Sequence, residues 1–434
     1  MSVNQIPPKD IQGDILDRLP KDCEHFLLFS IKDAAKFRES LRGLLAPDKG
    51  IGSAADVKDV RNKFSTWNKA NGRMEHSFYN IGFSKDGIDL LGLKHEDLND
   101  EHFNKGQLED AKILGDPMVR KSGQELPDWE DEFLKVALNE QHPIHGIILV
   151  AGNEKNVKEH SAEIRKALEE QGAASIVYFL EGAVLPGERR KNEHFGWRDG
   201  ISQPFVEGYT TDKHQTGQTK IPPGVLIVGA KGDLRASSRP EWARGGSFMV
   251  FRKLQQFVPE FKQFLVDAAI KEGVIGHENQ ANAAKLLGSR LFGRWPSGTP
   301  LEKQPAEDRG VPEDELNSFD YKNVKSPNCP FAAHIRKTNP RNGLPGNSTV
   351  NSSIVRAGIP YGEEWANNPE FPPTPSHEIV PGFDGIIGQN NKPGDARARN
   401  GIDGLEISKD FVHPRAGCYF FVPSIPALHE HFSG

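Results

Sequence analysis

The chain has 434 residues, of which 36% are hydrophobic and 26% charged, and its formal net charge is -6. This composition is typical of globular proteins, and the length predicts one large domain or two smaller ones. The negative charge and the lack of a polybasic run argue against a general nucleic-acid-binding protein.

The cysteines Cys23, Cys329 and Cys418 are too few and too scattered for a disulfide framework or a thiolate metal site. No apolar run approaches the roughly 20 residues that span a bilayer, so no membrane partner is expected. The first 33 residues lack the basic region and apolar core of a signal peptide. We therefore expect a cytoplasmic protein, or a secreted one if the gene prediction omits a leader.

The first half of the chain alternates between strand and helix patterns. Residues 6–18 are predicted to form a polar arm. Strands are predicted at Cys23–Ile31, His76–Phe83, Ile144–Val150 and Ser175–Leu180, and helices at Lys32–Leu45, Trp129–Leu138 and Asn153–Gln171. This order is the split βαβ pattern of a ferredoxin-like unit, with residues 85–141 as an insertion beside the sheet.

The second half repeats the pattern less completely. Strands are predicted at Ser247–Leu254 and Cys418–Val422, a helix at Phe257–Ile270, and a hairpin from Phe331–Ile335 and Ser353–Ala357. We predict an α+β fold of two ferredoxin-like units, residues 1–240 and 241–434. The second unit lacks a strand and part of a helix, because no strand followed by a helix is found between Gly362 and Cys418.

Three segments carry residues suited to chemistry. In HFGWRDGISQP, Gly196 and Gly200 flank Asp199, so that the backbone can turn tightly around a candidate acid or base. An Asx turn or helix cap is the plainer interpretation of this pattern, and the motif alone favours it.

In CPFAAHIRKTNPR, His334 follows a small apolar stretch and could bind a metal through its neutral imidazole. The nearby Arg336 and Arg341 suit an anionic cofactor. The plainer interpretation is a core histidine with solvated basic neighbours. In SSIVRAGIPYG, Arg356 lies in an apolar run, which favours either an anionic ligand or a structural ion pair about equally.

The order of these three segments and their amino-acid sequences resemble those of the dye-decolorizing peroxidases, in particular the fungal group. Further similarity lies in IQGDIL, SFMVFRKLQQF, PGFDGIIGQ and YFFVPSIPAL, so the resemblance covers nearly the whole chain. It implies haem b (iron protoporphyrin IX), bound between the halves of a dimeric α+β barrel. The implied partners are hydrogen peroxide and dye or aromatic electron donors; the protein could be a monomer or a homo-oligomer.

The resemblance also assigns residues. His334 resembles the proximal iron ligand, Asp199 the distal acid/base and Arg356 the distal arginine that stabilises O–O cleavage. Arg336, Arg341, Gly196, Gly200 and Ile201 are implied to contact the haem, and Asp384 to accept the other ring proton of His334. Aspartic acid ordinarily titrates near a pKa of about 3.9, against about 6.5 for histidine, so we expect an acidic optimum.

Tyr361 and Trp365 match surface positions that pass electrons outward in fungal relatives, although ordinary surface aromatics would look the same. Trp197 is expected to serve packing. Family members usually carry an apolar strand between the segments that here meet at Gly362 and Trp365, and its loss would leave Ser247–Leu254 with an unpaired edge.

Two other functions stay open. The first is a haem-binding protein that has lost turnover because of the missing segment. The second is a non-haem metal enzyme using residues such as His142 and His145, although their spacing matches no strong metal signature.

Overall fold

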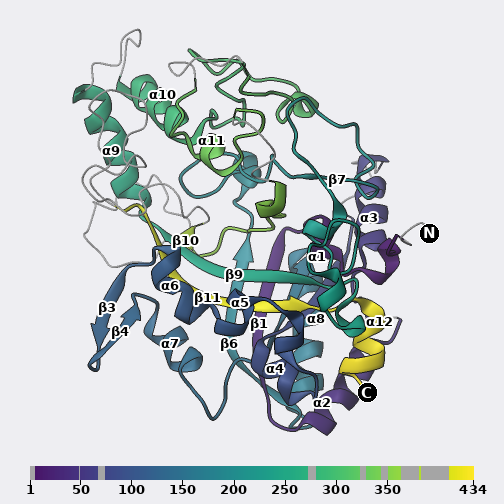
Figure 1. Ribbon diagram of the computed structural model, residues 1–434. Coiled ribbons are helices and arrows are strands. Elements are labelled where there is room, and N and C mark those ends of the chain that lie inside the picture. The colour runs from purple at the N-terminus through teal and green to yellow at the C-terminus, as the bar shows by residue number, and fades with distance from the viewer. Residues whose placement is uncertain are drawn as a thin grey trace.

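The computed structural model describes residues 5–47, 49–66, 74–271, 280–322, 329–343, 350–362, 381–382 and 410–434. Within these ranges the chain is built around a seven-stranded antiparallel sheet with the order β10-β9-β11-β2-β5-β1-β6 (Figure 1). Its strands are β1 (Cys23–Ile31), β2 (Ser77–Phe83), β5 (Gly146–Gly152), β6 (Ala174–Ala183), β9 (Ser247–Gln256), β10 (Pro381–Gly382) and β11 (Val412–Val422).

Helices and two small sheets surround this central sheet. The helices are α1 (Gly13–Leu16), α2 (Ala34–Leu44), α3 (Ala54–Thr66), α4 (Lys85–Leu90), α5 (Glu101–Lys105), α6 (Gln107–Leu114), α7 (Asp131–Ala137), α8 (Glu154–Glu169), α9 (Val258–Lys271), α10 (Gln280–Phe292), α11 (His334–Thr338) and α12 (Ile425–Ala427). The small sheets pair β3 (Met118–Lys121) with β4 (Gln124–Pro127), and β7 (Phe205–Val206) with β8 (Lys220–Ile221).

The first ferredoxin-like unit is confirmed. Its strands lie in the order β2-β5-β1-β6, so the first strand of the unit is flanked by the third and the fourth. Helix α2 begins where the carboxylate of Asp33 accepts hydrogen bonds of 3.0 Å from the backbone N–H groups of Ala35 and Lys36. Its apolar face, including Phe37 and Leu41, is buried in the same core cluster as β1.

The second unit is seen only in part among the described residues. Its first strand, β9, pairs along its length with its last strand, β11. On the other edge of β9 only Leu254 and Gln255 have a partner among the described residues, the two-residue strand β10. The junction between Gly362 and Trp365 lies outside the described residues, so the missing strand and the boundary at residue 240 stay predictions.

Two sequence-based expectations are wrong. Residues 6–18 are not a polar arm. Ile6, Ile11 and Ile15 are buried in an apolar cluster with Ile227, and helix α1 contributes Ile15 to that cluster. The predicted hairpin does not form either. Its first half becomes the start of α11, and residues 353–360 form no strand among the described residues.

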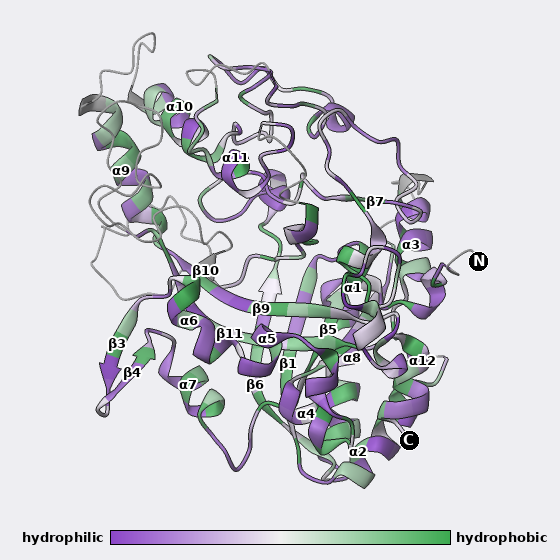
Figure 2. Cartoon of the chain, viewed as in Figure 1, coloured by the Kyte–Doolittle hydropathy of each residue, from purple (hydrophilic) through white to green (hydrophobic). Residues whose placement is uncertain are grey.

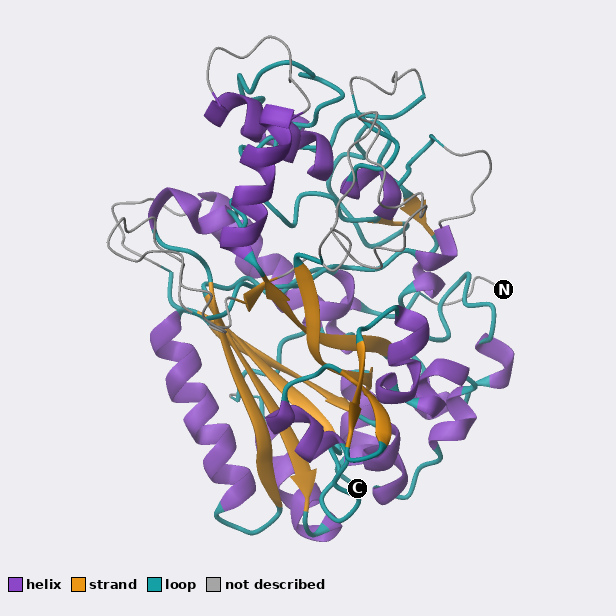
Figure 3. Cartoon of the chain, turned by 90° about the vertical axis from the view of Figure 1, so that its left-hand side faces the viewer, coloured by secondary structure: helices purple, strands orange, loops and turns teal. Residues whose placement is uncertain are grey.

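Figure 2 shows hydrophobic residues along the strands of the central sheet, whereas the helices carry both hydrophobic (green) and hydrophilic (purple) residues. Figure 3 shows helices flanking the strands at one end of the molecule and a loop-rich region at the other. Helices α9, α10 and α11 lie in this second region (Figure 1). No helix among the described residues is long and apolar enough to cross a membrane.

Candidate active site

The buried carboxylate of Glu193 holds the turn that carries Asp199 through hydrogen bonds. This carboxylate accepts hydrogen bonds from the backbone N–H groups of Phe195 (2.9 Å) and Trp197 (2.8 Å) and from Nε2 of Gln256 in β9 (2.7 Å). Burial raises the pKa of Glu193 to about 7. The motif turn is therefore tied directly to the central sheet.

Trp197 serves packing, as expected. Its ring stacks on that of Phe292 with centroids 4.5 Å apart, and its Nε1–H donates to the carbonyl of Arg294 at 2.9 Å. Gly200 has a φ of +73°, a conformation that favours glycine because an L-residue meets steric strain there. It lets the chain leave the turn directly after Asp199.

Asp199 and Arg356 meet across the site. Nη1 of Arg356 donates to Oδ1 of Asp199 at 3.0 Å, and Nη2 to the carbonyl of Ser202 at 3.3 Å. Both side chains keep contact with solvent, with 25% of Asp199 and 31% of Arg356 exposed. A cation therefore holds one carboxylate oxygen while leaving room for a small molecule.

Gln203 fixes the backbone of the arginine segment. Its Nε2 donates to the carbonyl of Arg356 at 2.7 Å, and its Oε1 accepts from the Arg356 N–H at 3.1 Å. The segment is also attached to the edge of β6, because the N–H of Ala183 donates to the carbonyl of Pro360 at 2.8 Å. The two catalytic candidates thus come from one motif loop and one extended segment.

His334 begins the short helix α11 and is buried, with 8% of its surface exposed. It lines the same cavity as Asp199 and Arg356, which has a volume of about 1300 Å³. Small-molecule pockets are usually about 300–1,000 Å³, so this cavity can take a large ligand.

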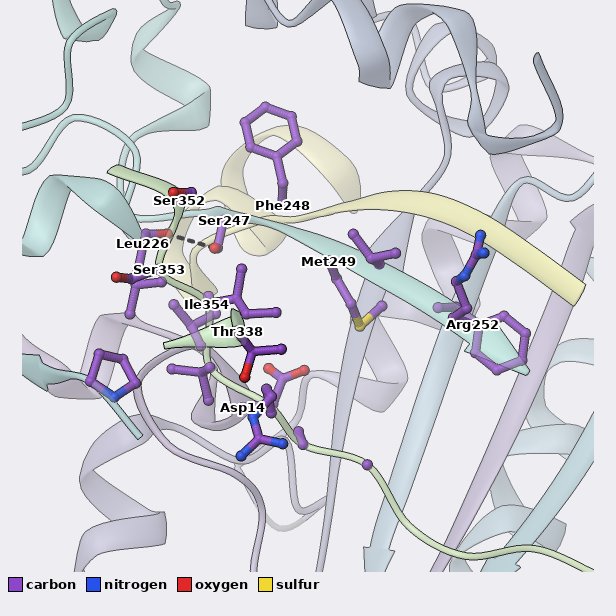
Figure 4. Close-up of a pocket in the computed structure, with 18 of the residues that line it drawn as sticks. Asp14, Leu226, Ser247, Phe248, Met249, Arg252, Thr338, Ser352, Ser353 and Ile354 are labelled. Atoms are coloured by element: carbon purple, nitrogen blue, oxygen red, sulfur yellow. Dashed lines mark hydrogen bonds between the residues drawn. The ribbon is translucent and has the colours of Figure 1, made fainter. Parts of the chain in front are cut away.

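The walls of the cavity combine apolar and cationic side chains. The apolar ones include Phe26, Ile147, Leu149, Leu180 and Phe248, and the cationic ones include Arg198, Lys253, Arg294 and Lys337. Figure 4 shows part of the lining, with Ser352, Ser353 and Ile354 from the arginine segment and Phe248, Met249 and Arg252 from β9. An imidazole, apolar walls and several cations fit a flat, largely apolar cofactor with acidic groups, such as haem.

Comparisons with known proteins show the family to which the chain belongs. Residues 10–186 match the DyP dimeric alpha+beta barrel domain. Peroxidase 2 of Mycetinis scorodonius is 34% identical, in an alignment that covers 98% of this chain and 87% of the relative. The chain belongs to the dye-decolorizing peroxidase family.

Further members show the same similarity. The dye-decolorizing peroxidase of Exidia glandulosa is 33% identical, in an alignment that covers 99% of this chain and 87% of that relative. The structure of an ancestral D-type dye-decolorizing peroxidase is 37% identical, with a TM-score of 0.82 over 99% of this chain and 100% of that one. The alignment with Peroxidase 2 spans 489 residues, more than the 434 of this chain, so that relative carries residues that this peroxidase lacks.

The two arginines predicted to meet the cofactor bind elsewhere. Arg336 donates to the carbonyl of Cys329 at 2.5 Å and stacks over the ring of Phe331, 3.9 Å from its centroid. Arg341 donates to the carbonyl of Phe319 at 2.7 Å and stacks on that ring at 3.8 Å. Neither lines the cavity, so the geometry gives the predicted contact of these arginines with cofactor carboxylates no support.

Other predicted residues have mixed outcomes. Ile201 lines the cavity, whereas Gly196 and Gly200 shape the turn beside it. Asp384 and Trp365 lie outside the described residues.

Tyr361 is not on the surface. Only 8% of it is exposed, it lines the cavity, and its hydroxyl donates to the carbonyl of Leu254 at 3.1 Å. The prediction of a surface position is therefore wrong: a backbone bridge to Gly182 of β6 places Tyr361 beside the central sheet.

The predicted non-haem metal site has no support. Nδ1 of the buried His145 accepts a hydrogen bond from the backbone N–H of Ile31 at 2.8 Å, whereas His142 is exposed. Within the described part of the chain, neither belongs to a group of three possible metal ligands.

Sequence analysis missed two arginines near Asp199. Arg294 is buried and lines the cavity, its Nη2 donates to Oγ of Ser202 at 2.9 Å, and burial lowers its pKa to about 9. Burial also lowers the pKa of Arg18, which lies close to the charge of Asp199. The apolar context of Arg294 in LFGRWP was the available signal; Arg18 follows Asp17 directly, which suggested a local ion pair and gave no signal of a site.

Proposed function

We propose that this chain is a haem peroxidase that uses hydrogen peroxide to oxidise dyes and phenolic or aromatic donors. The observation that carries the proposal is the 3.0 Å contact between Asp199 and Arg356 in the cavity that His334 also lines. One solved relative, 32% identical with a TM-score of 0.77, is a dye-decolorizing peroxidase in complex with 2,6-dimethoxyphenol.

His334 would hold the haem iron through a ring nitrogen. The apolar walls would contact the porphyrin. Lys337 or Arg198, which also line the cavity, would meet the acidic groups of the porphyrin. When bound, haem supplies the redox chemistry by which peroxide is reduced and donors are oxidised one electron at a time.

Asp199 would move the proton that this chemistry requires. Arg356 binds Oδ1 of Asp199, so Oδ2 is the oxygen available to take a proton from peroxide and return it to the leaving oxygen atom. Because the guanidinium is already positioned, it can stabilise the negative charge that develops on the leaving oxygen without rearranging. Partial exposure of both side chains gives a small oxidant access.

The experiment uses the full chain loaded with haem. We expect a Soret band that changes on addition of one equivalent of peroxide, and peroxide-dependent bleaching of an anthraquinone dye. Asp199→Asn and Arg356→Leu should each lower kcat/KM for peroxide by about 10²- to 10³-fold while the Soret band is kept. Asp59→Asn, an exposed carboxylate on α3, is the control and should behave as wild type.

A haem-binding protein without turnover is the second candidate function. The sparse pairing of the outer edge of β9 among the described residues favours it, since a shortened pocket wall would admit water to the site and impair turnover while leaving His334 in place to hold haem. A normal Soret band without dye bleaching in the wild-type chain would support this alternative and contradict the first proposal.

A further inference from the structure

Strand β1 presents different chemistry on its two faces. Glu24 and Phe26 line the large cavity. Because side chains alternate along a strand, Cys23 and His25 lie on the opposite face. Glu181 of β6 is the register partner of His25 and shares that face. Three potential metal ligands are therefore gathered on the side of the sheet that faces away from the cavity.

The ligand atoms of these three residues lie close together. Sγ of Cys23, a ring nitrogen of His25 and a carboxylate oxygen of Glu181 are all within 4.8 Å of one another. Cys23 and His25 are buried, with 2% and 4% exposed, whereas 46% of the Glu181 side chain reaches solvent. An ion could enter past Glu181 and be held by the two buried groups.

The ring of His25 is oriented for binding. Its Nδ1 lies 2.9 Å from Oγ of Ser161 in α8, which can accept the Nδ1 proton and leave the Nε2 lone pair free. Nε2 is buried without a hydrogen-bond partner among the described residues, and Oε1 of Glu181 lies 3.7 Å from it. A buried polar atom without a partner is costly, and a metal ion would satisfy it.

We propose that Cys23, His25 and Glu181 form a zinc site, independent of the haem cavity. Thiolate, imidazole and carboxylate are the ligands that zinc takes in proteins, at about 2.0–2.3 Å. Ligand atoms around a tetrahedral ion at those distances stand about 3.3–3.8 Å apart, so small side-chain rotations close the site. Water completes it on the exposed side of Glu181.

Nearby cations weaken the site without blocking it. Lys158 is paired with Glu154 at 2.6 Å, and Arg165 lies over the ring of Phe179, 5.5 Å from its centroid. Zinc must displace the thiol proton of Cys23 when it binds.

The test uses the full, haem-loaded chain after dialysis against a chelator, titrated with zinc sulfate in a calorimeter. We expect one zinc ion per chain by elemental analysis, and sulfur among the ligands in zinc-edge X-ray absorption, which haem iron does not obscure. Cys23→Ser and Glu181→Gln should each weaken binding at least tenfold. Ser161→Ala should weaken it about tenfold through the loss of ring orientation.

Cys418→Ser and Glu170→Gln are the matched controls, a thiol and an exposed carboxylate elsewhere, and should keep wild-type affinity. Thermal unfolding without zinc shows that each variant is folded, and zinc should raise Tm in the wild type but not in Cys23→Ser. The proposal is overturned if the wild type takes up no zinc, or if Cys23→Ser and Glu181→Gln bind it as tightly as the wild type.

Discussion

Gln203 and Arg356 are 153 residues apart in the chain and are joined by two hydrogen bonds, of 2.7 and 3.1 Å, between the amide side chain of one and the backbone of the other. The side chain thus acts as a strand partner would. Because the guanidinium of Arg356 starts from this fixed backbone, its approach to Asp199 depends on a residue that need not touch the substrate.

Gln203→Ala is therefore expected to lower kcat/KM for peroxide by about ten- to a hundredfold, since each lost hydrogen bond is worth about 0.5–1.5 kcal/mol. Steady-state kinetics at several peroxide concentrations measure this. Gln203→Glu keeps the acceptor for the Arg356 N–H and should retain more activity than Gln203→Ala. Equal activity of wild type and Gln203→Ala would show that the backbone contact does not position Arg356.

Asp199 and Arg356 are expected to act as a unit. Each single substitution, Asp199→Asn or Arg356→Leu, already disrupts the 3.0 Å contact, so the double variant should be hardly slower than the slower single variant. A double-mutant cycle on kcat/KM for peroxide measures the coupling. Multiplicative losses in the double variant would mean that the two side chains work independently.

Gly200→Ala and Gly196→Ala are both expected to destabilise the turn that carries Asp199. Both positions have positive φ, +73° at Gly200 and +104° at Gly196, where an L-residue meets steric strain of about 1–2 kcal/mol. A Cβ at Gly200 would also lie 2.0 Å from Nη1 of Arg18, the flexible end of that side chain, whereas a Cβ at Gly196 meets nothing within 4 Å. Chemical unfolding of both variants measures the loss, and wild-type stability in either variant would contradict the strain.

Asp14 should make stability depend on pH. Burial, together with the charge of Glu24, raises its pKa from 3.8 to about 6. The folded state therefore binds this proton more tightly than the unfolded state does, so the stabilisation is complete below pH 3.8 and is lost as the pH rises to about 6. The shift corresponds to at most about 3 kcal/mol.

The free energy of unfolding of wild type and Asp14→Asn, measured at intervals from pH 4 to 7, tests this. The variant should lose less stability over this interval, because asparagine does not titrate. Asp59→Asn, the exposed control on α3, should follow the wild-type slope. A parallel slope for Asp14→Asn would rule out Asp14 as the titrating group.

Tyr361→Phe tests whether the buried ring passes electrons from the cavity to bulky donors. We expect slower dye bleaching with an unchanged initial reaction with peroxide, because Asp199 and Arg356 are untouched. The lost hydrogen bond to Leu254 should cost only about 1 kcal/mol of stability. If bleaching keeps its wild-type rate, the electron path does not run through Tyr361.

The first ferredoxin-like unit could be predicted from the sequence because its signals are local. Alternating and helical apolar patterns at Cys23–Ile31 and Asn153–Gln171 match β1 and α8 to within a few residues. The motifs around Asp199, His334 and Arg356 are sufficient by themselves to indicate the family, since their residue types and spacing are specific.

Tertiary structure alone decided which arginines reach the cavity. Arg336 and Arg341 follow His334 closely in sequence, yet aromatic rings and backbone carbonyls hold their guanidinium groups away from it. Arg294 lines the cavity from a distant segment. A side chain's direction depends on the partners that packing brings to it, and these partners are far away in the chain. Sequence by itself therefore determined the family and the chemical groups of the site, and only the fold decided which charges face one another.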